Sequence, residues 1–338
     1  MAENAPAVSG EPLRLLRWIG VIQVSRKSAL NVLWWNPRRS SRSARALKLI
    51  LRRVGARARP AGSSFVHGNA GDLVGPAIAR LEYNCLAIES FGPRVAFCGS
   101  IGDLVRRHDV WCGIGLKRPE FLDPVDGGRV YGVRGHLTLS ALKRAGVTFA
   151  QDPFVGDPGW YLARKFAAVR AESKVEETVH SSGPGLLLHY RHAKQELNGA
   201  ARGFKVLSID SDPFQLFAEI LACSEVFTSS LHGIIFCHAL EIPVHFVSPP
   251  TDEPMFKYFD YGSSNNWFPS PISLEDAGSR VGSSEVHVNS LKEEEFHSVW
   301  ENLNHMVGLM KTDYSASDLN FEELPVYVSS NQVEDHSY

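Results

Sequence analysis

Short apolar runs alternate with helix-like patterns along most of the chain. In the segment 225–247, the run 226–228 is too short for a helix, and the apolar residues after it recur at helical spacing as far as Pro243. Residues 244–247 then return to a strand pattern. This stretch predicts strand, turn, helix and strand, with Ser229 and Ser230 as the natural N-caps of a helix whose first turn is 231–233.

The same alternation predicts a parallel α/β sheet in each half of the chain. The expected strands are 29–36, 94–100, 109–115 and 129–135 in the first half, and 186–190, 204–210, 226–228 and 244–247 in the second. The expected helices begin at about 73, 137, 213, 231 and 291. Because ligands of open α/β sheets bind at the carboxyl ends of strands, we expect two Rossmann-like lobes with a central cleft.

A charged tract that ends in Ser, Gly and Pro, residues 170–185, marks the expected boundary between the lobes. The expected domains are an N-terminal extension at 1–29, a first lobe at 30–175 with a basic insertion at 37–62, a second lobe at 184–311 and a polar acidic tail at 312–338.

Composition indicates a globular protein, with 338 residues of which 44% are hydrophobic. No apolar run approaches the ~20 residues that span a bilayer, and Arg14 and Arg17 interrupt the one segment that resembles a signal peptide. The five cysteines are scattered and never form a C-x-x-C pair, which favours buried thiols over disulfides or a structural zinc. We therefore expect a cytoplasmic protein.

One segment departs from the chain's balanced charge. Residues 12–60 hold thirteen Lys or Arg and no Asp or Glu, which indicates a polyanionic partner or a solvated basic face. Residues 46–54 mix apolar and basic positions as an interfacial amphipathic helix does. We therefore expect an anionic membrane surface to bind 37–60, and no nucleic acid. In the alternative, this loop folds over the cleft and its arginines bind substrate.

Polar residues gather where the expected strands end. They are Asn69, Asp72, Arg134, Asp157, His189, Arg191, Ser230 and His232. His232 would sit beside a helix N-terminus, where unpaired N–H groups favour an anion. Each has a structural alternative: the two Asp residues as turn caps, Arg134 in an ion pair with a surface carboxylate, and either histidine bonded within its own turn.

Several motifs together resemble the polysaccharide pyruvyl transferase family over about residues 30–265. They are "NVLWWNP", "GNAGDLVGPAI", "VYGVRGHLTLSALKRAG", "GDPG", "LLLHYRH" and "SSLHGIIFCHALEIPVHFV", followed by "KYFDYGSS". The resemblance implies a GT-B-like enzyme that transfers the enolpyruvyl unit of phosphoenolpyruvate to two hydroxyls of a sugar, forming a pyruvate ketal and releasing phosphate.

The resemblance also implies roles for particular residues. Arg134 matches the family arginine that holds the phosphoenolpyruvate anion, and His232 matches the histidine of the Leu-His motif. Some members carry a second arginine before Leu-His, but this chain has Ser230 there. Arg191, Lys257 or the helix N-terminus would then supply the remaining positive field.

Ketal formation requires a proton on the methylene carbon and the loss of a proton from a sugar hydroxyl. As a hypothesis, His232 is the acid or an oxyanion contact, and Asp72 or His189 is the base. The expected substrate-binding residues are Asn69, Arg134, Asp157, Arg191, Ser230, Leu231, Gly233 and Lys257. Phosphoenolpyruvate is the donor substrate, and no cofactor and no metal are expected, because no His, Cys or carboxylate group has ligand spacing.

The expected acceptor is a sugar of a cell-surface glycan or of its lipid-linked precursor, which would place the protein at the inner face of the cell membrane. Two other functions compete with this one. A sugar-nucleotide glycosyltransferase of the GT-B fold fits the same architecture, because fold does not fix function. A non-catalytic protein that binds membrane or nucleic acid through its basic block would need no polar residues at strand ends.

Overall fold

The computed structural model describes residues 28–34, 68–83, 85–88, 92–120, 125–172, 183–192, 203–250, 252–283 and 311–313. The basic insertion 37–62 and the helix expected near 291–310 lie outside the described residues. Within the described ranges, no helix has both the length and the apolar composition that crossing a bilayer requires.

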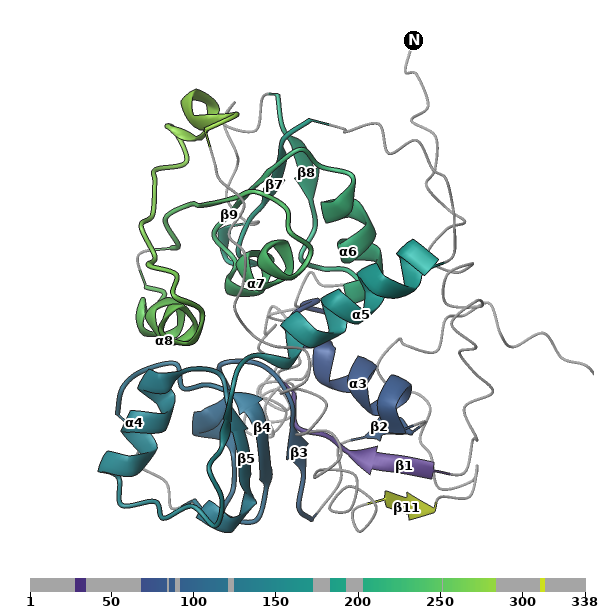
Figure 1. Ribbon diagram of the computed structural model, residues 1–338, viewed down its shortest axis with the longest axis vertical. Coiled ribbons are helices and arrows are strands. Elements are labelled where there is room, and N and C mark those ends of the chain that lie inside the picture. The colour runs from purple at the N-terminus through teal and green to yellow at the C-terminus, as the bar shows by residue number, and fades with distance from the viewer. Residues whose placement is uncertain are drawn as a thin grey trace, which may run out of the picture.

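The first half of the chain forms a four-stranded parallel sheet in the order β3-β4-β5-β6 (Figure 1). Its strands are β3 (Val95–Ala96), β4 (Val110–Ile114), β5 (Val130–Val133) and β6 (Phe154–Val155). Both β3 and β4 are buried throughout, as expected of strands covered on two faces. Helices α3 (Val74–Tyr83) and α4 (His136–Arg144) and the 3₁₀ helices Gly102–Leu104 and Gly127–Arg129 belong to this half.

A smaller sheet adjoins β3. Strand β1 (Ser28–Asn31) pairs in parallel with β2 (Leu86–Ile88) and antiparallel with β11 (Lys311–Asp313). A parallel bridge between Val32 and Val95 connects β1 to β3. The expected tail 312–338 therefore begins inside a strand, and the sequence pattern did not predict this pairing with the first strand of the chain.

The second half forms another four-stranded parallel sheet, in the order β10-β9-β7-β8. The strands are β7 (Gly185–Leu187), β8 (Lys205–Leu207), β9 (Val226–Thr228) and β10 (Val244–Phe246). The chain moves from β7 to β8 on one side and places β9 on the other. The carboxyl ends of β7 and β9 therefore meet at a topological switch point, where open α/β sheets bind ligands.

Helices fill the space between the two sheets, and α8 joins the halves. A continuous hydrophobic cluster includes residues of α3, of α5 (Pro158–Glu172), of α6 (Pro213–Leu221) and of α7 (Leu231–Ala239). Helix α8 (Phe256–Asn265) follows the second sheet but packs on α4 of the first half (Figure 1). The last described helix is the 3₁₀ turn Ala277–Arg280.

The structure confirms the mixed α/β class, the parallel sheets and the alternation of strands and helices that the apolar pattern predicts. It also confirms that the five cysteines are buried thiols. Helices α5 and α8 and strands β2 and β6 were not predicted.

Candidate active site

The amino end of α7 is built as the sequence predicts. Ser230 is the N-cap, and its side chain accepts a hydrogen bond from the Gly233 N–H at 3.4 Å. Thr228 fixes the preceding turn, because its Oγ1 accepts from the Ser230 N–H and donates to the Leu187 carbonyl. A Cβ on Gly233 would lie 2.4 Å from Thr228 Oγ1, so only glycine allows this close approach. Leu231 is a core residue, 2% exposed.

The imidazole ring of His232 is packed against neighbouring residues on several sides. It stacks on Phe236 of the same helix, with ring centroids 5.8 Å apart, and its Nε2 lies 3.1 Å from Sγ of Cys98. The Nδ1 side faces Gly71, where a Cβ would lie only 1.9 Å away. Burial, followed by the charges of Arg134 and Lys257, lowers the pKa of His232 to about 3. The imidazole is therefore neutral near pH 7.

The contact with Gly71 gives a direct test of this placement. Gly71→Ala should lower turnover by at least about tenfold, because the new methyl group must displace the imidazole and misplaced catalytic groups lose rate steeply. Gly278→Ala is the matched control, since a Cβ there meets open space. Steady-state turnover of the two variants, with circular dichroism to verify folding, makes the comparison. Equal turnover would show that the position of His232 does not matter.

Asp157 follows β6 and is completely buried. Its Oδ1 accepts from the Gly159 N–H at 2.8 Å, which confirms the turn-capping alternative, and it also lies 3.4 Å from Sγ of Cys98. Oδ2 has no hydrogen-bond partner among the described residues. Burial raises the pKa of Asp157 to about 6, against the opposing charge of Arg134.

The turn that carries Asn69 and Asp72 reaches the second half of the chain. Asn69 forms a bridge with Asp210, and its side-chain oxygen accepts from the Gly71 N–H. Asp72 is 9% exposed, and burial raises its pKa to about 7 although Lys257 and Lys117 oppose the shift. A carboxyl group of that kind exchanges protons near neutral pH.

Arg134 is fully buried and is already engaged. Its Nε and Nη2 lie 3.0 and 2.9 Å from Oδ2 of Asp260 in α8. Nη2 also donates to the Leu116 carbonyl, and Nη1 donates to Ser100 Oγ at 2.5 Å. The structural alternative for Arg134, an ion pair with a surface carboxylate, is therefore wrong, because its carboxylate partner Asp260 has no exposed surface. Of these contacts, the one to half-buried Ser100 points toward the more open side.

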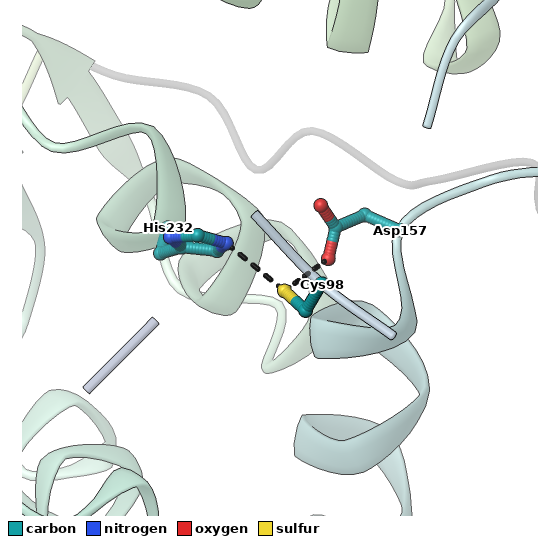
Figure 2. Close-up of side chains that lie close together, drawn as sticks. All are labelled: Cys98, Asp157 and His232. Atoms are coloured by element: carbon teal, nitrogen blue, oxygen red, sulfur yellow. Dashed lines mark hydrogen bonds between the residues drawn. The ribbon is translucent and has the colours of Figure 1, made fainter. Parts of the chain in front are cut away.

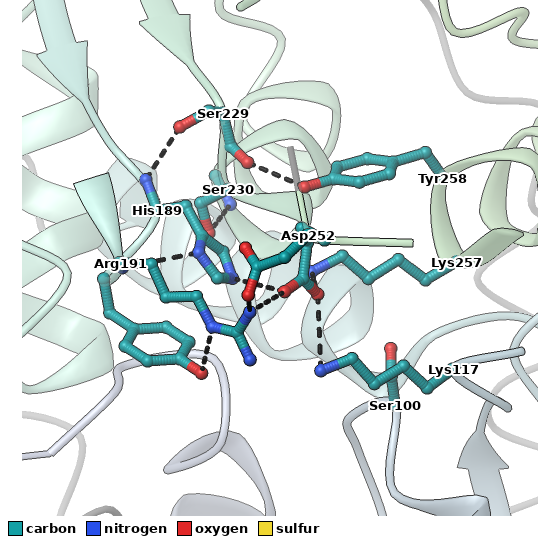
Figure 3. Close-up of polar contacts among 12 residues, drawn as sticks. Ser100, Lys117, His189, Arg191, Ser229, Ser230, Asp252, Lys257 and Tyr258 are labelled. Carbon is teal, nitrogen blue, oxygen red and sulfur yellow. Dashed lines mark hydrogen bonds and ion pairs between the residues drawn. The ribbon is translucent and has the colours of Figure 1, made fainter. Parts of the chain in front are cut away.

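Three cations and a histidine surround one buried carboxylate at the ends of the parallel strands. This group, here called the Glu253 cluster, consists of Lys117, His189, Arg191, Glu253 and Lys257. Lys257 Nζ lies 2.6 Å and Lys117 Nζ 3.7 Å from Glu253 Oε1, while Arg191 Nη1 lies 3.6 Å from Oε2. Figure 3 shows Lys117 and Arg191, from different halves of the chain, converging beside Lys257, Ser230 and Ser100. Arg191 also pairs with Asp252.

His189 is held by its neighbours rather than left open. Its N–H donates to Ser229 Oγ, its Nδ1 accepts from the Arg191 N–H at 3.4 Å, and its Nε2 lies 3.9 Å from Glu253 Oε2. Burial, with the charges of Lys257 and Arg191, lowers its pKa to about 2. Since Nδ1 accepts, the imidazole proton sits on Nε2 and faces Glu253.

The structure thus brings the expected residues into two neighbouring groups. One is centred on His232 with Asp157 and the Asn69–Asp72 turn, and the other is the Glu253 cluster with Ser230. A profile of the polysaccharide pyruvyl transferase family matches residues 128–250, which hold Arg134, Asp157, His189, Arg191 and the Ser230–Gly233 turn. The chain belongs to the polysaccharide pyruvyl transferase family.

One relative of this chain is a protein of Acanthamoeba polyphaga mimivirus that is itself uncharacterized. The two are 30% identical over 211 residues, which cover 57% of this chain and 69% of the relative. No solved structure matches the chain.

Sequence reasoning missed five residues of this family member's site: Cys98, Ser100, Lys117, Glu253 and Asp260. The first three follow β3 and β4, so the rule that selected the other strand-end residues also applies to them. Glu253 and Asp260 precede or lie within α8 and carry no such signal, because only the packing of α8 brings them to the site.

Proposed function

We propose that this protein transfers the enolpyruvyl unit of phosphoenolpyruvate to two hydroxyls of a glycan, forming a pyruvate ketal with release of phosphate. The observation that carries the proposal is the Glu253 cluster. It holds Lys117, Arg191 and Lys257 against Glu253 and Asp252, beside the amino end of α7. An excess of cations at a helix N-terminus suits a donor that has a phosphate and a carboxylate.

The net reaction takes a proton from each of the two acceptor hydroxyls. One proton must reach the methylene carbon of the donor, and the other leaves with phosphate. His232 and Asp72 are the proposed proton-transfer groups, because Asp72 has a pKa of about 7 and directly follows Gly71, the residue that contacts the His232 ring. His189 is less suited to be the base, since its Nδ1 already accepts a hydrogen bond.

Arg134 is proposed to act from beneath the donor site. Its contact with Ser100 lies on the side of Lys117, so its positive field and the Ser100 hydroxyl would support an anion held by the lysines. Asn69, Leu231 and Gly233 would shape the site through the turns they occupy. The two parallel sheets would be the two lobes of a GT-B-like enzyme, with donor and acceptor between them.

The proposed acceptor is a glycan or its lipid-linked precursor. The basic segment 37–60 is proposed to bind an anionic membrane surface. A lipid-linked acceptor would make such placement useful, because the site would then remain close to its substrate.

The proposed reaction is tested by phosphate release from phosphoenolpyruvate across a panel of free and lipid-linked glycans. Release should depend on the acceptor, and the product should gain the mass of a ketal-linked pyruvate. Thermal shift separates the rival function, since stabilisation by a UDP or GDP sugar and not by phosphoenolpyruvate would support a glycosyltransferase. Failure of every acceptor together with no stabilisation by phosphoenolpyruvate would overturn the proposal.

Lys257 should give donor binding a characteristic pH dependence. Burial lowers its pKa to about 8, even with Glu253 opposing the shift, so the ammonium is charged below that value and neutral above it. We expect kcat/KM for phosphoenolpyruvate to fall by up to about tenfold per pH unit as the pH rises above that value. Lys257→Met should remove this limb and lower kcat/KM at all pH values. Lys165→Met, which changes a half-exposed lysine paired with Glu82, is the control. An unchanged limb in Lys257→Met would assign it to another group.

A further inference from the structure

A continuous hydrogen-bonded chain connects Asp157, Cys98 and His232. Cys98 Sγ lies 3.4 Å from Asp157 Oδ1 and 3.1 Å from His232 Nε2 (Figure 2). The three side chains come from three separate places: the end of β3, the end of β6 and the first turn of α7. All are buried, and Gly159, Phe236 and Gly71 fix the orientations of the two outer groups.

The surroundings of His232 oppose a positive charge on its ring. The ring is desolvated and lies in the field of Arg134 and Lys257, so an imidazolium would be an additional cation in a buried site that already contains two. A histidine in such a position exchanges protons readily only if the charge is neutralised elsewhere. Asp157 is a buried carboxyl group two hydrogen bonds away, with one oxygen that has no partner among the described residues.

We propose that Cys98 relays protons between His232 and Asp157, so that His232 accepts and returns a proton at Nδ1 without becoming an imidazolium. With Asp157 ionised, the thiol donates to Oδ1 and the Nε2–H donates to Sγ, which leaves the Nδ1 lone pair available. When Nδ1 gains a proton, the Nε2 proton moves to Sγ and the thiol proton moves to Oδ1. The products are the other neutral imidazole tautomer, an intact thiol and a neutral carboxylic acid.

The charges near these three hydrogen-bonded side chains favour the final state, in which the thiol is intact and Asp157 is neutral. Besides burial, Asp157 and Asp72 raise the pKa of the Cys98 thiol well above its usual value, so a thiolate is not a resting state. Asp157 itself has a pKa of about 6, set by burial against Arg134 and with a contribution from Asp260. A proton that passes through Cys98 therefore ends on the Asp157 carboxylate and not on the thiol. Nδ1 faces the turn that holds Gly71 and Asp72, which is the side from which the proton would arrive.

The tautomer of His232 tests the relay without any substrate. In two-bond ¹H–¹⁵N spectra of the histidine rings, wild-type His232 should change from the Nε2–H tautomer to the Nδ1–H tautomer as the pH falls through about 6, following Asp157. Cys98→Ser keeps a hydroxyl that can pass the proton, so the change should persist. Cys98→Ala and Asp157→Asn should both abolish it. Cys112→Ala removes another buried thiol of the same sheet and should leave it intact.

Turnover gives a second measurement, which rests on the proposed function. Cys98→Ala should lower kcat by at least about tenfold with little change in KM for phosphoenolpyruvate, because proton transfer and not donor binding is lost. Cys98→Ser should recover most of kcat, and Cys112→Ala should resemble wild type. A purely structural role of Cys98 would not separate serine from alanine in both the spectra and kcat.

Three results would overturn the relay. The first is a His232 ring that titrates to the doubly protonated form, and the second is a tautomer or a kcat that Cys98→Ala does not change. The third is a stoichiometric metal ion in the purified protein that Cys98→Ser removes, because the three donor atoms lie within 4.8 Å of one another and a bound ion would occupy Sγ and Nε2. Since the spectra need no substrate, absence of transferase activity would be distinguishable from failure of the relay.

Discussion

Arg134→Ala should reduce the free energy of unfolding by about 3–5 kcal/mol, because it leaves the carboxylate of Asp260 buried without its cation. Both side chains have no exposed surface, and the guanidinium contacts Asp260 through two nitrogens. Asp260 keeps its hydrogen bonds from the Thr138 N–H and Oγ1, but neither group carries a positive charge. Chemical denaturation followed by circular dichroism gives the loss.

An exposed ion pair on the same molecule provides the matched control. Arg164 pairs with Glu241 at 2.7 Å, but the side chains are 35% and 55% exposed, so Arg164→Ala should cost less than about 1 kcal/mol. Arg134→Lys should fall between the two, because an ammonium keeps the charge and loses the two-nitrogen contact. If Arg134→Ala and Arg164→Ala destabilise equally, the buried pair does not hold α8 against α4.

The ion pair between Arg134 and Asp260 changes how activity data on Arg134 should be interpreted. A lost activity in Arg134→Ala reports on donor binding only at temperatures and denaturant concentrations where the variant is shown to be folded. Ser100→Ala is the cleaner probe of the proposed donor contact, because it removes the group at Nη1 and leaves Asp260 paired.

The sequence predicted those parts of the fold that local patterns determine. Continuous apolar runs predicted β4, β7 and β9, because strands covered on both faces have no polar side to alternate. The serines before α7 predicted its start, and Ser230 is the cap. The rule that ligands lie at strand ends selected His189 and Arg191 as candidates, and the structure places both in the Glu253 cluster.

What the sequence did not predict depends on contacts between distant segments. Asp260 meets Arg134 across 126 positions, and Cys98 meets His232 across 134. The apolar pattern placed Cys98 inside the expected strand 94–100, where a cysteine indicates burial, and only the structure shows that β3 ends before it. Strand β11 pairs with β1, which is distant from it in the sequence, and a strand of three residues is too short for its apolar pattern to be recognised.

His232→Ala should lower kcat by about 10²–10⁴-fold, the range expected when a positioned proton-transfer group is removed. The structure offers a matched control in His238, which is buried on the same helix α7, stacks on Tyr261 and lies 3.0 Å from its hydroxyl. His238→Ala creates a similar void in the same helix but lies in the last turn of α7, whereas His232 lies in the first. It should therefore lower stability and leave kcat of the folded protein within about threefold of wild type.

A second substitution separates the ring from the volume it fills. His232→Gln fills much of the space and keeps a polar group near Cys98, but it cannot exchange protons, so its kcat should be as low as that of the alanine variant. Both variants should retain stabilisation by phosphoenolpyruvate, because the cations that would bind the donor belong to the Glu253 cluster. Near-normal kcat in His232→Gln would show that the residue packs the amino end of α7 and takes no part in proton transfer.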